Sequence, residues 1–412
     1  MSDTLFSSHG KLSESGPRDP AALEKDLSLC CQQIEALRAC LVDAQVLRQS
    51  AFLAKLHKVQ FDTVWKTYKF TSDSGLQDIL QIEGAAVSLG VHLGRAALTH
   101  VAAASKQTCN QVSNLWPVVK DLNRIYVCGG SCDSRHSAGS TLCFDPETPS
   151  WKDLPRMSDR RAYASAGVAG DRLYVFGGSS NGLNGLPLST GKCLNITSGE
   201  WETMPPMSLA RKNAAASFLG GKLYVCGGMG EDSQPLGSVE RYDPSVSIWE
   251  SLPSMTTLRD GPAVTGTPWD ELYVCGGHNG TTAMTSVERF QPVANRWQPA
   301  VSMLEARFSA AAAFLQNRIF VCGGVSDGMQ HLRSVESLSF DAGFWETVEP
   351  MTTGRCLFSA VVVERCIFVL GGFSGDEYLN SVECYDPTSG SWTQRPPMPE
   401  RCEGAAVAAG LA

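Results

Sequence analysis

The sequence predicts an all-β fold, a six-bladed β-propeller preceded by an α-helical N-terminal region. Three observations predict the propeller. A short apolar strand ending in Gly-Gly occurs six times, for example as RLYVFGG at 172–178 and KLYVCGG at 222–228. The glycine pairs start at 129, 177, 227, 276, 323 and 371, a spacing typical of propeller repeats. A tryptophan follows every pair, and a methionine follows each tryptophan by six residues.

The chain begins with a polar stretch, 1–19, which we expect to be a disordered tail. Asp19 and Pro20 form a good helix start, because aspartate caps a helix and proline suits its first position. Neither glycine nor proline interrupts 21–74, so we expect a long helix over 20–70. Its apolar residues keep heptad spacing for about three heptads. The helix therefore either forms a coiled-coil homodimer or packs against its own chain.

Charge and cysteine usage exclude several classes of protein. With 34 basic and 42 acidic residues and no long run of like charge, a nucleic-acid-binding surface has little electrostatic support. The N-terminus lacks an apolar signal segment, and no apolar stretch of about 18 residues occurs, so we expect no membrane association. The expected location is cytoplasmic, with the nucleus as the alternative. The 15 cysteines fit reduced thiols, because an odd number without Cys-x-x-Cys pairs suits neither disulfides nor zinc.

Each repeat contains four short strands, called a to d in chain order. In the third unit these are AAASFL, KLYVC, SVERYD and SIWESL, separated by Gly, Pro and Asp turns. Four antiparallel strands make one blade, and a blade cannot bury both faces alone, so six blades must stack around an axis. We expect the glycine pairs where blades crowd together and the tryptophans between neighbouring blades.

The repeated pattern carries a family resemblance over residues 121–412. Tyr/Phe-Val-x-Gly-Gly, then Val-Glu-x-Tyr/Phe-Asp-Pro, then Trp and Pro-x-Met resemble Kelch repeats. Units two and five depart locally, with CLNI and Leu338-Ser339 in the place of the Tyr-Asp-Pro turn. The resemblance implies the propeller fold, and it leaves the role open, because Kelch propellers include interaction modules and a few enzymes.

Residues 76–118 are expected to form a small helical segment. Its end, ASKQTCNQVSNLWPVV, is similar to the second half of an F-box through Ser105, Lys106, Leu115 and Trp116. The alternative is a helical linker that supports the first blade.

The first unit lacks its own strand a. In units two to six an arginine introduces that strand, whereas the segment before 124 has neither the arginine nor a run of small residues. The C-terminus supplies Arg401 and a small apolar strand. We therefore predict that 402–410 pairs with the strand around 124–128 and closes the ring, so that no edge stays exposed.

The loops between strands b and c and the links from strand d to the next strand a should share one face. The arginines that introduce strands would then encircle one opening. Because the arginine guanidinium donates paired hydrogen bonds to carboxylates and phosphates, the expected ligand is an acidic or phosphorylated protein segment. Alternatively, each arginine pairs with a neighbouring blade. The candidate ligand-binding residues are Arg161, Arg211, Arg259, Arg307, Arg355, His278, His331 and Tyr378.

Metal or catalytic chemistry finds little support. Four units carry cysteine before the glycine pair, but Phe176 and Leu370 fill that position elsewhere, so the position requires only an apolar side chain. The propeller histidines His136, His278 and His331 have no matched carboxylates. We expect no metal, no cofactor and no catalytic residues.

These observations favour a non-catalytic protein-recognition scaffold over an enzyme. The resemblance suggests a substrate receptor of a cullin-type ubiquitin ligase, with a cullin adaptor as one partner. The alternative is a sugar-active propeller enzyme such as a sialic-acid epimerase.

Overall fold

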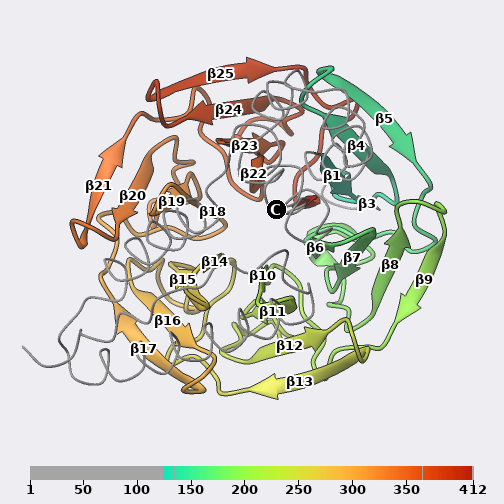
Figure 1. Cartoon of the computed structure of the whole chain (residues 1–412), viewed down its shortest axis with the longest axis horizontal. Coiled ribbons are helices and arrows are strands. Elements are labelled where there is room, and N and C mark those ends of the chain that lie inside the picture. The colour runs from blue at the N-terminus through green and yellow to red at the C-terminus, as the bar shows by residue number, and fades with distance from the viewer. Residues whose placement is uncertain (1–123, 134–135, 364, 411–412) are drawn as a thin grey trace, which may run out of the picture. The chain divides into compact units, whose positions relative to one another are not determined.

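The computed structural model describes residues 124–133, 136–363 and 365–410. Their strands form six four-stranded antiparallel sheets around one axis, which confirms the predicted six-bladed propeller (Figure 1). The predictions for 1–19, 20–70 and 76–118 lie outside the described residues. No helix within the described part of the chain is long and apolar enough to span a membrane.

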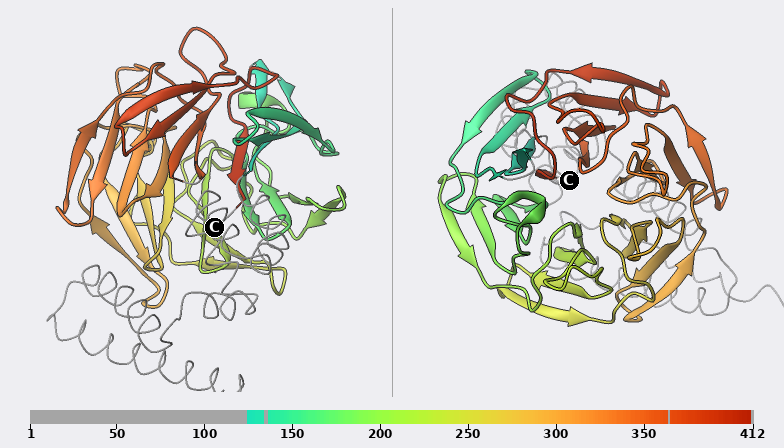
Figure 2. Two further views of the ribbon diagram at one scale, coloured as in Figure 1. Left: turned by 45° about the horizontal axis from the view of Figure 1, so that its top comes forward. Right: turned by 180° about the vertical axis from the view of Figure 1, so that it is seen from behind.

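The strands of each blade follow one another in order from the axis to the rim, and the outer strands form the rim in both face-on views (Figures 1 and 2). The innermost strands are β26 (Ala406–Ala409), β6 (Ser165–Ala169), β10 (Ala215–Leu219), β14 (Ala263–Thr267), β18 (Ala311–Leu315) and β22 (Ser359–Val363). The second strands are β1 (Ile125–Cys128), β7 (Arg172–Phe176), β11 (Lys222–Cys226), β15 (Glu271–Cys275), β19 (Arg318–Cys322) and β23 (Cys366–Leu370).

The third and fourth strands complete the blades. The third strands are β4 (Thr141–Asp145), β8 (Gly191–Asn195), β12 (Val239–Asp243), β16 (Val287–Gln291), β20 (Val335–Ser339) and β24 (Val382–Asp386). The outer strands are β5 (Ser150–Leu154), β9 (Trp201–Met204), β13 (Ile248–Leu252), β17 (Arg296–Ala300), β21 (Phe344–Val348) and β25 (Ser391–Arg395). A hairpin of β2 (Ser131–Asp133) and β3 (His136–Ser137) and the 3₁₀ helix η1 (Gly182–Asn184) lie in loops between second and third strands.

Blade 1 joins the two ends of the propeller sequence. Strand β26 pairs antiparallel with β1, with Ile125 opposite Ala409 and Cys128 opposite Ala406. The resulting sheet has the order β26-β1-β4-β5, so the innermost strand comes from the C-terminal end of the described residues. This is the closure that the missing first strand of unit one predicts.

The burial pattern follows from the stacking of blades. The second strand of blade 3 is buried at four of its five positions, while the outer strand is mostly exposed. A strand with a neighbouring blade on each face needs apolar side chains on both faces, and the apolar runs before Gly-Gly satisfy this need. In blade 3 every predicted strand lies within one residue of the observed strand.

The tryptophans of the outer strands tie each blade to the preceding one. Each indole N–H donates to a backbone carbonyl in the preceding blade's outgoing link, at 2.7–3.2 Å. The ring also packs on apolar neighbours, as Trp249 does against Phe176 at a centroid distance of 5.7 Å. The predicted placement of tryptophan between blades is confirmed.

Candidate functional site at one face of the propeller

The loops between second and third strands and the links between blades meet at one face, which we call the mouth face. Isolated backbone bridges join the residue after each Gly-Gly to the residue after the arginine of a link. Asp260 pairs in this way with His278, and Phe308 with Val325. The shared face predicted from strand alternation is therefore present.

The five arginines that introduce strands are not free on this face. Their side chains are at most 1% exposed. Each guanidinium donates to the carbonyl of the first glycine in its own blade, at 2.6–3.0 Å. Four of them also pair with a glutamate of the third strand; Arg211 lies 2.8 Å from Glu240, for example. Arg161 pairs instead with Asp159 at 3.4 Å, because Lys192 replaces the glutamate in blade 2.

The backbone of each arginine holds the preceding blade. The N–H of Gly178 donates to the carbonyl of Arg211 at 2.9 Å. The neighbouring Gly177 has a φ of +66°, and a Cβ there would lie 2.7 Å from the same carbonyl, so only glycine fits. The predicted crowding at Gly-Gly is confirmed.

Each arginine thus joins two blades, its side chain in the following blade and its backbone in the preceding one. The prediction that Arg161, Arg211, Arg259, Arg307 and Arg355 form a free ligand-binding ring is wrong, because buried glycine carbonyls and glutamates already occupy the guanidinium groups. The alternative, in which these arginines hold neighbouring blades together, describes the structure.

In blade 1 the contact with the preceding blade is made without a buried arginine–glutamate pair. The backbone of Cys402 makes the contacts that arginine makes elsewhere, accepting from Gly372 N at 2.9 Å. Leu142 occupies the position of the glutamate, so the charged pair is replaced as a unit. Arg401, which the sequence suggested for this role, is instead exposed and pairs with Glu377. The position of Arg401 is a further correction.

The residues two positions after the five arginines, together with the one two positions after Cys402, form a closed circle of backbone hydrogen bonds, which we call the axial ring. Each member has a φ between +51° and +59°, and each N–H donates to the carbonyl of the previous member at 2.7–3.1 Å. The members are Tyr163, Asn213, Gly261, Ser309, Leu357 and Gly404. The ring links every blade to the next around the axis.

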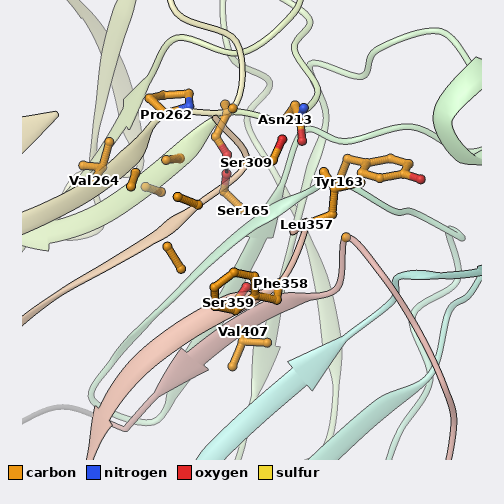
Figure 3. Close-up of a pocket in the computed structure, with 18 of the residues that line it drawn as sticks. Tyr163, Ser165, Asn213, Pro262, Val264, Ser309, Leu357, Phe358, Ser359 and Val407 are labelled. Atoms are coloured by element: carbon orange, nitrogen blue, oxygen red, sulfur yellow. Dashed lines mark hydrogen bonds between the residues drawn. The ribbon is translucent and has the colours of Figure 1, made fainter. Parts of the chain in front are cut away.

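Beyond the axial ring lies a cavity of about 740 Å³, including space open to solvent. Figure 3 shows Tyr163, Asn213 and Ser309 at one side of it and Ser359 and Val407 at another. Alanine is the commonest residue in its wall, contributed by the innermost strands and the residues just before them. The hydroxyl of Ser165 donates to Ala214 O at 2.7 Å, and that of Ser359 to Ala405 O at 3.1 Å. No carboxylate, histidine or lysine lines this cavity among the described residues, so it offers an approaching ligand no ionic contact.

The residue directly after each of the five arginines, or after Cys402 in blade 1, differs from blade to blade. We call these residues the collar. They are Ala162, Lys212, Asp260, Phe308, Cys356 and Glu403. Since small and apolar residues occupy this position in three links, the fold does not require charge there. Aligning the repeats on the arginine would have revealed Asp260, whereas Glu403 follows Cys402 and is found only once Cys402 is recognised in the arginine's place.

Asp260 is a buried carboxylate without a matched cation. Its side chain is 8% exposed, and Oδ1 has no hydrogen-bond partner in the structure. Burial raises the pKa of Asp260 to about 6, against opposing effects of Asn213, Lys212 and the N–H of Gly261. Nζ of Lys212 instead donates to the carbonyls of Leu183 and Gly185, at 2.6 and 3.0 Å. Asp260 therefore carries a desolvated charge that no ion pair compensates.

Glu403 is the second collar carboxylate and is 6% exposed. The hydroxyl of Tyr163 donates to its Oε1 at 2.5 Å. Burial raises the pKa of Glu403, and the bond from Tyr163 opposes this rise. Glu403 is thus held by one neutral donor, in contrast to the glutamates that pair with arginines.

The predicted histidines and Tyr378 lie on the mouth face in aromatic contacts. His278 packs edge-on against Phe308 at 5.2 Å between centroids, and His331 against Phe373 at 5.5 Å. Tyr378 packs on Phe373 at 5.3 Å. Burial lowers the pKa of His331, against the opposing charge of Asp376. Across the described ranges, no group of three or more His, Cys, Asp or Glu residues could hold a metal ion.

Comparison with known families fits this architecture. The family model described as KLHDC2/KLHL20/DRC7 Kelch-repeats domain matches residues 115–306, and the model described as Kelch motif matches 306–352 and 354–399. The chain belongs to the Kelch-repeat family. The solved structure of YjhT resembles this Kelch propeller with a TM-score of 0.57 at 14% identity, over 66% of this chain and 97% of that one. At this identity the likeness shows the fold alone.

One relative in sequence is an F-box/kelch-repeat protein of Arabidopsis thaliana. It is 39% identical to this Kelch protein over 64 residues, which are 16% of this chain. The matched segment spans 17% of that relative's own length.

Replacing Asp260 by asparagine should stabilise this Kelch propeller at neutral pH. Because its folded-state pKa of about 6 lies above the usual value, unfolding releases a proton, and stability falls as pH rises from about 4 to about 6. We expect Asp260→Asn to raise the free energy of unfolding by about 1–3 kcal/mol at pH 7.5 and by less than about 1 kcal/mol at pH 4. Urea unfolding at both pH values measures the change. Destabilisation by Asp260→Asn at pH 7.5 would contradict this account.

The cysteines before the glycine pairs should be inert in the folded Kelch propeller. Burial raises the pKa of Cys128, Cys226, Cys275 and Cys322 to about 12, whereas Cys132 is exposed. Since the thiolate is the reactive form, iodoacetamide at pH 8 should label Cys132 and spare the other four until the protein unfolds. Peptide mass spectrometry gives the labelling rates. Comparable rates at Cys132 and Cys226 would contradict this prediction.

Proposed function

We propose that this Kelch protein is a non-catalytic protein-recognition module and serves as the substrate receptor of a cullin-type ubiquitin ligase. One observation carries the recognition role. Framework positions repeat from blade to blade, namely Gly-Gly and the interblade tryptophan in all six and the buried arginine in five, while the collar positions all differ. A mouth face that varies on a constant scaffold is what recognition of a specific partner requires.

The ligase assignment rests on likeness. One relative is named for an F-box together with Kelch repeats, and the N-terminal segment 76–118 is similar to half of an F-box. In this proposal the segment contacts a cullin adaptor, and the mouth face binds the substrate. The protein would then act in the cytoplasm or the nucleus, either as a monomer or as a homodimer through 20–70.

Affinity purification of the full chain from cells tests the ligase role. We expect a cullin and its adaptor to be recovered with the chain and to be lost from the double variant Leu115→Ala/Trp116→Ala. The matched control is Asp260→Asn, which lies on the mouth face and should keep the adaptor. Absence of a cullin from the wild-type sample would refute the receptor role. Turnover of a sugar by the purified chain would refute the non-catalytic role.

A further inference from the structure

The links between blades are not equivalent on the mouth face, and three consecutive links, which we call the apolar half, combine apolar and acidic groups; the neighbouring loop of blade 2 adds the exposed Leu183 and Leu186. The links into blades 3, 4 and 5 each expose a leucine: Leu209, Leu258 and Leu304 are 44%, 50% and 62% exposed. None of the other three links contributes an exposed large apolar side chain among the described residues. Asp260 lies two residues after Leu258, in the middle link of the apolar half.

The charge of this half is negative. Besides Asp260, exposed carboxylates of the loops in blades 3 and 5 lie on the same face, namely Glu231, Asp232 and Asp327. The arginines of the three links are paired with glutamates in their own blades. Lys212 is held by two carbonyls of the neighbouring loop. Arg333, in the loop of blade 5, is exposed, but the carboxylates outnumber it. The net charge available to a partner is therefore acidic, which is the reverse of the arginine ring predicted from the sequence.

Asp260 gives this half a specific point of attachment. A buried carboxylate with an unpartnered oxygen is unfavourable for the isolated protein, because a charge leaves water without compensation. The repeat supplies an internal comparison, since Ala162, Phe308 and Cys356 show that uncharged residues fit the same position. The terminal torsion of aspartate is broad, so either carboxylate oxygen can turn toward an incoming group.

We propose that this half of the mouth face binds a partner protein segment in which a lysine or arginine is flanked by apolar residues. The cationic group pairs with Asp260, and the flanking side chains cover Leu209, Leu258 and Leu304. A cation that bonds to the carboxylate compensates its desolvated charge and gains a charge-assisted hydrogen bond. This inference rests on the proposed recognition function and names the chemistry of the ligand.

Labelled peptide pools test the inference directly. We design three pools of 12-residue peptides in which every position except the central one is drawn at random from Leu, Ala, Ser and Gly. The central residue is Lys or Arg in the basic pool, Glu in the glutamate pool and Gln in the neutral pool. Fluorescence anisotropy with the full chain gives the dissociation constants. We expect the basic pool to bind at least about tenfold more tightly than the glutamate pool, as expected for a charge-assisted hydrogen bond.

Three variants of the protein distinguish binding at Asp260 from nonspecific attraction of basic peptides to an acidic protein. Asp260→Asn should weaken binding of the basic pool about ten- to a hundredfold, the loss expected for a charged hydrogen bond. Leu258→Ser should weaken it to a smaller extent. The matched control Asp270→Asn removes an exposed carboxylate from the turn between β14 and β15, at the opposite face, and should leave binding unchanged.

Three outcomes would overturn the proposal. These are equal or tighter binding of the glutamate pool, equal binding by wild type and Asp260→Asn, and no binding of any pool. The recognition function itself is judged separately, by recovery of the cullin and its adaptor. If the cullin and its adaptor are recovered but any of these three outcomes is observed, the ligase role is retained and the proposal of a basic ligand is rejected.

Discussion

A chain that ends at Arg401 is expected to lose the cooperative unfolding of the whole propeller. The truncation removes β26, which leaves β1 as an open edge and uncovers the cluster that contains Val127 and Phe144. It also removes Gly404 and so breaks the axial ring at two hydrogen bonds. We expect a loss of more than about 5 kcal/mol, comparable with the entire stability of an ordinary domain. Circular dichroism and calorimetric melting curves measure the transition.

The control for the truncation is a chain that ends at residue 410, which keeps β26 and should melt like the full chain. An unchanged transition in the chain that ends at Arg401 would show that blade 1 is stable without its innermost strand. Broad, gradual melting of that chain would instead support the role of β26 in closure.

Replacing Arg355 by alanine should destabilise the propeller by about 3–5 kcal/mol, the range seen when one partner of a buried ion pair is removed. The guanidinium bonds to Gly371 O at 2.9 Å and to Ser381 Oγ at 3.0 Å, and it pairs with Glu383. Its loss leaves the buried Glu383 carboxylate without its cation, and the carbonyls of Gly371 and Ser381 without the guanidinium donor. Differential scanning calorimetry should show a melting temperature lower by roughly 10 °C.

Two variants give this prediction its controls. Arg401→Ala removes an exposed pair with Glu377 and should change stability by less than about 1 kcal/mol. The double variant Arg355→Cys/Glu383→Leu copies the uncharged pair of blade 1 and should be less destabilising than Arg355→Ala. Equal melting temperatures for Arg355→Ala and Arg401→Ala would show that the buried pair contributes nothing to the closed ring.

The fold could be predicted because its signals repeat. A single apolar strand before Gly-Gly is ambiguous, but six copies in step with tryptophan define a blade and its period. The sequence before 124 lacks the arginine and the run of small residues that introduce a first strand, while a surplus apolar segment follows Arg401, and together these predicted the closure. Strand boundaries followed from the turn residues, because blade 3 places glycine, proline and aspartate at its turns.

The role of the arginines could not be read from their position alone. Topology places them on the mouth face, but burial depends on where the side chain turns. Arg211 turns inward, where it donates to the buried carbonyl of Gly227 and the partly buried carbonyl of Ser238, which need donors. The accompanying glutamate, Glu240, was visible in the sequence nine residues before the tryptophan. Reading the arginine and the glutamate as one repeated pair would have predicted a buried framework.

The collar and the axial ring could not be predicted from sequence patterns. Tyr163 and Leu357 adopt a positive φ that their residue types disfavour, so no local propensity announces the ring. Asp260 and Glu403 are acidic residues in polar loops by sequence, and only the packed structure shows that they are buried. Functional candidates of this kind are found where the repeats disagree.

The axial ring also determines which part of the protein creates the electric field on its axis. All six of its hydrogen bonds run in the same sense around the circle. Their peptide dipoles therefore follow one another head to tail in a closed circulation, and the vector sum nearly vanishes. A helix N-terminus, where dipoles align, attracts anions through its backbone. Within the plane of the ring the backbone favours neither sign, so the charged side chains of the collar and the loops determine the sign of the charge that a partner meets.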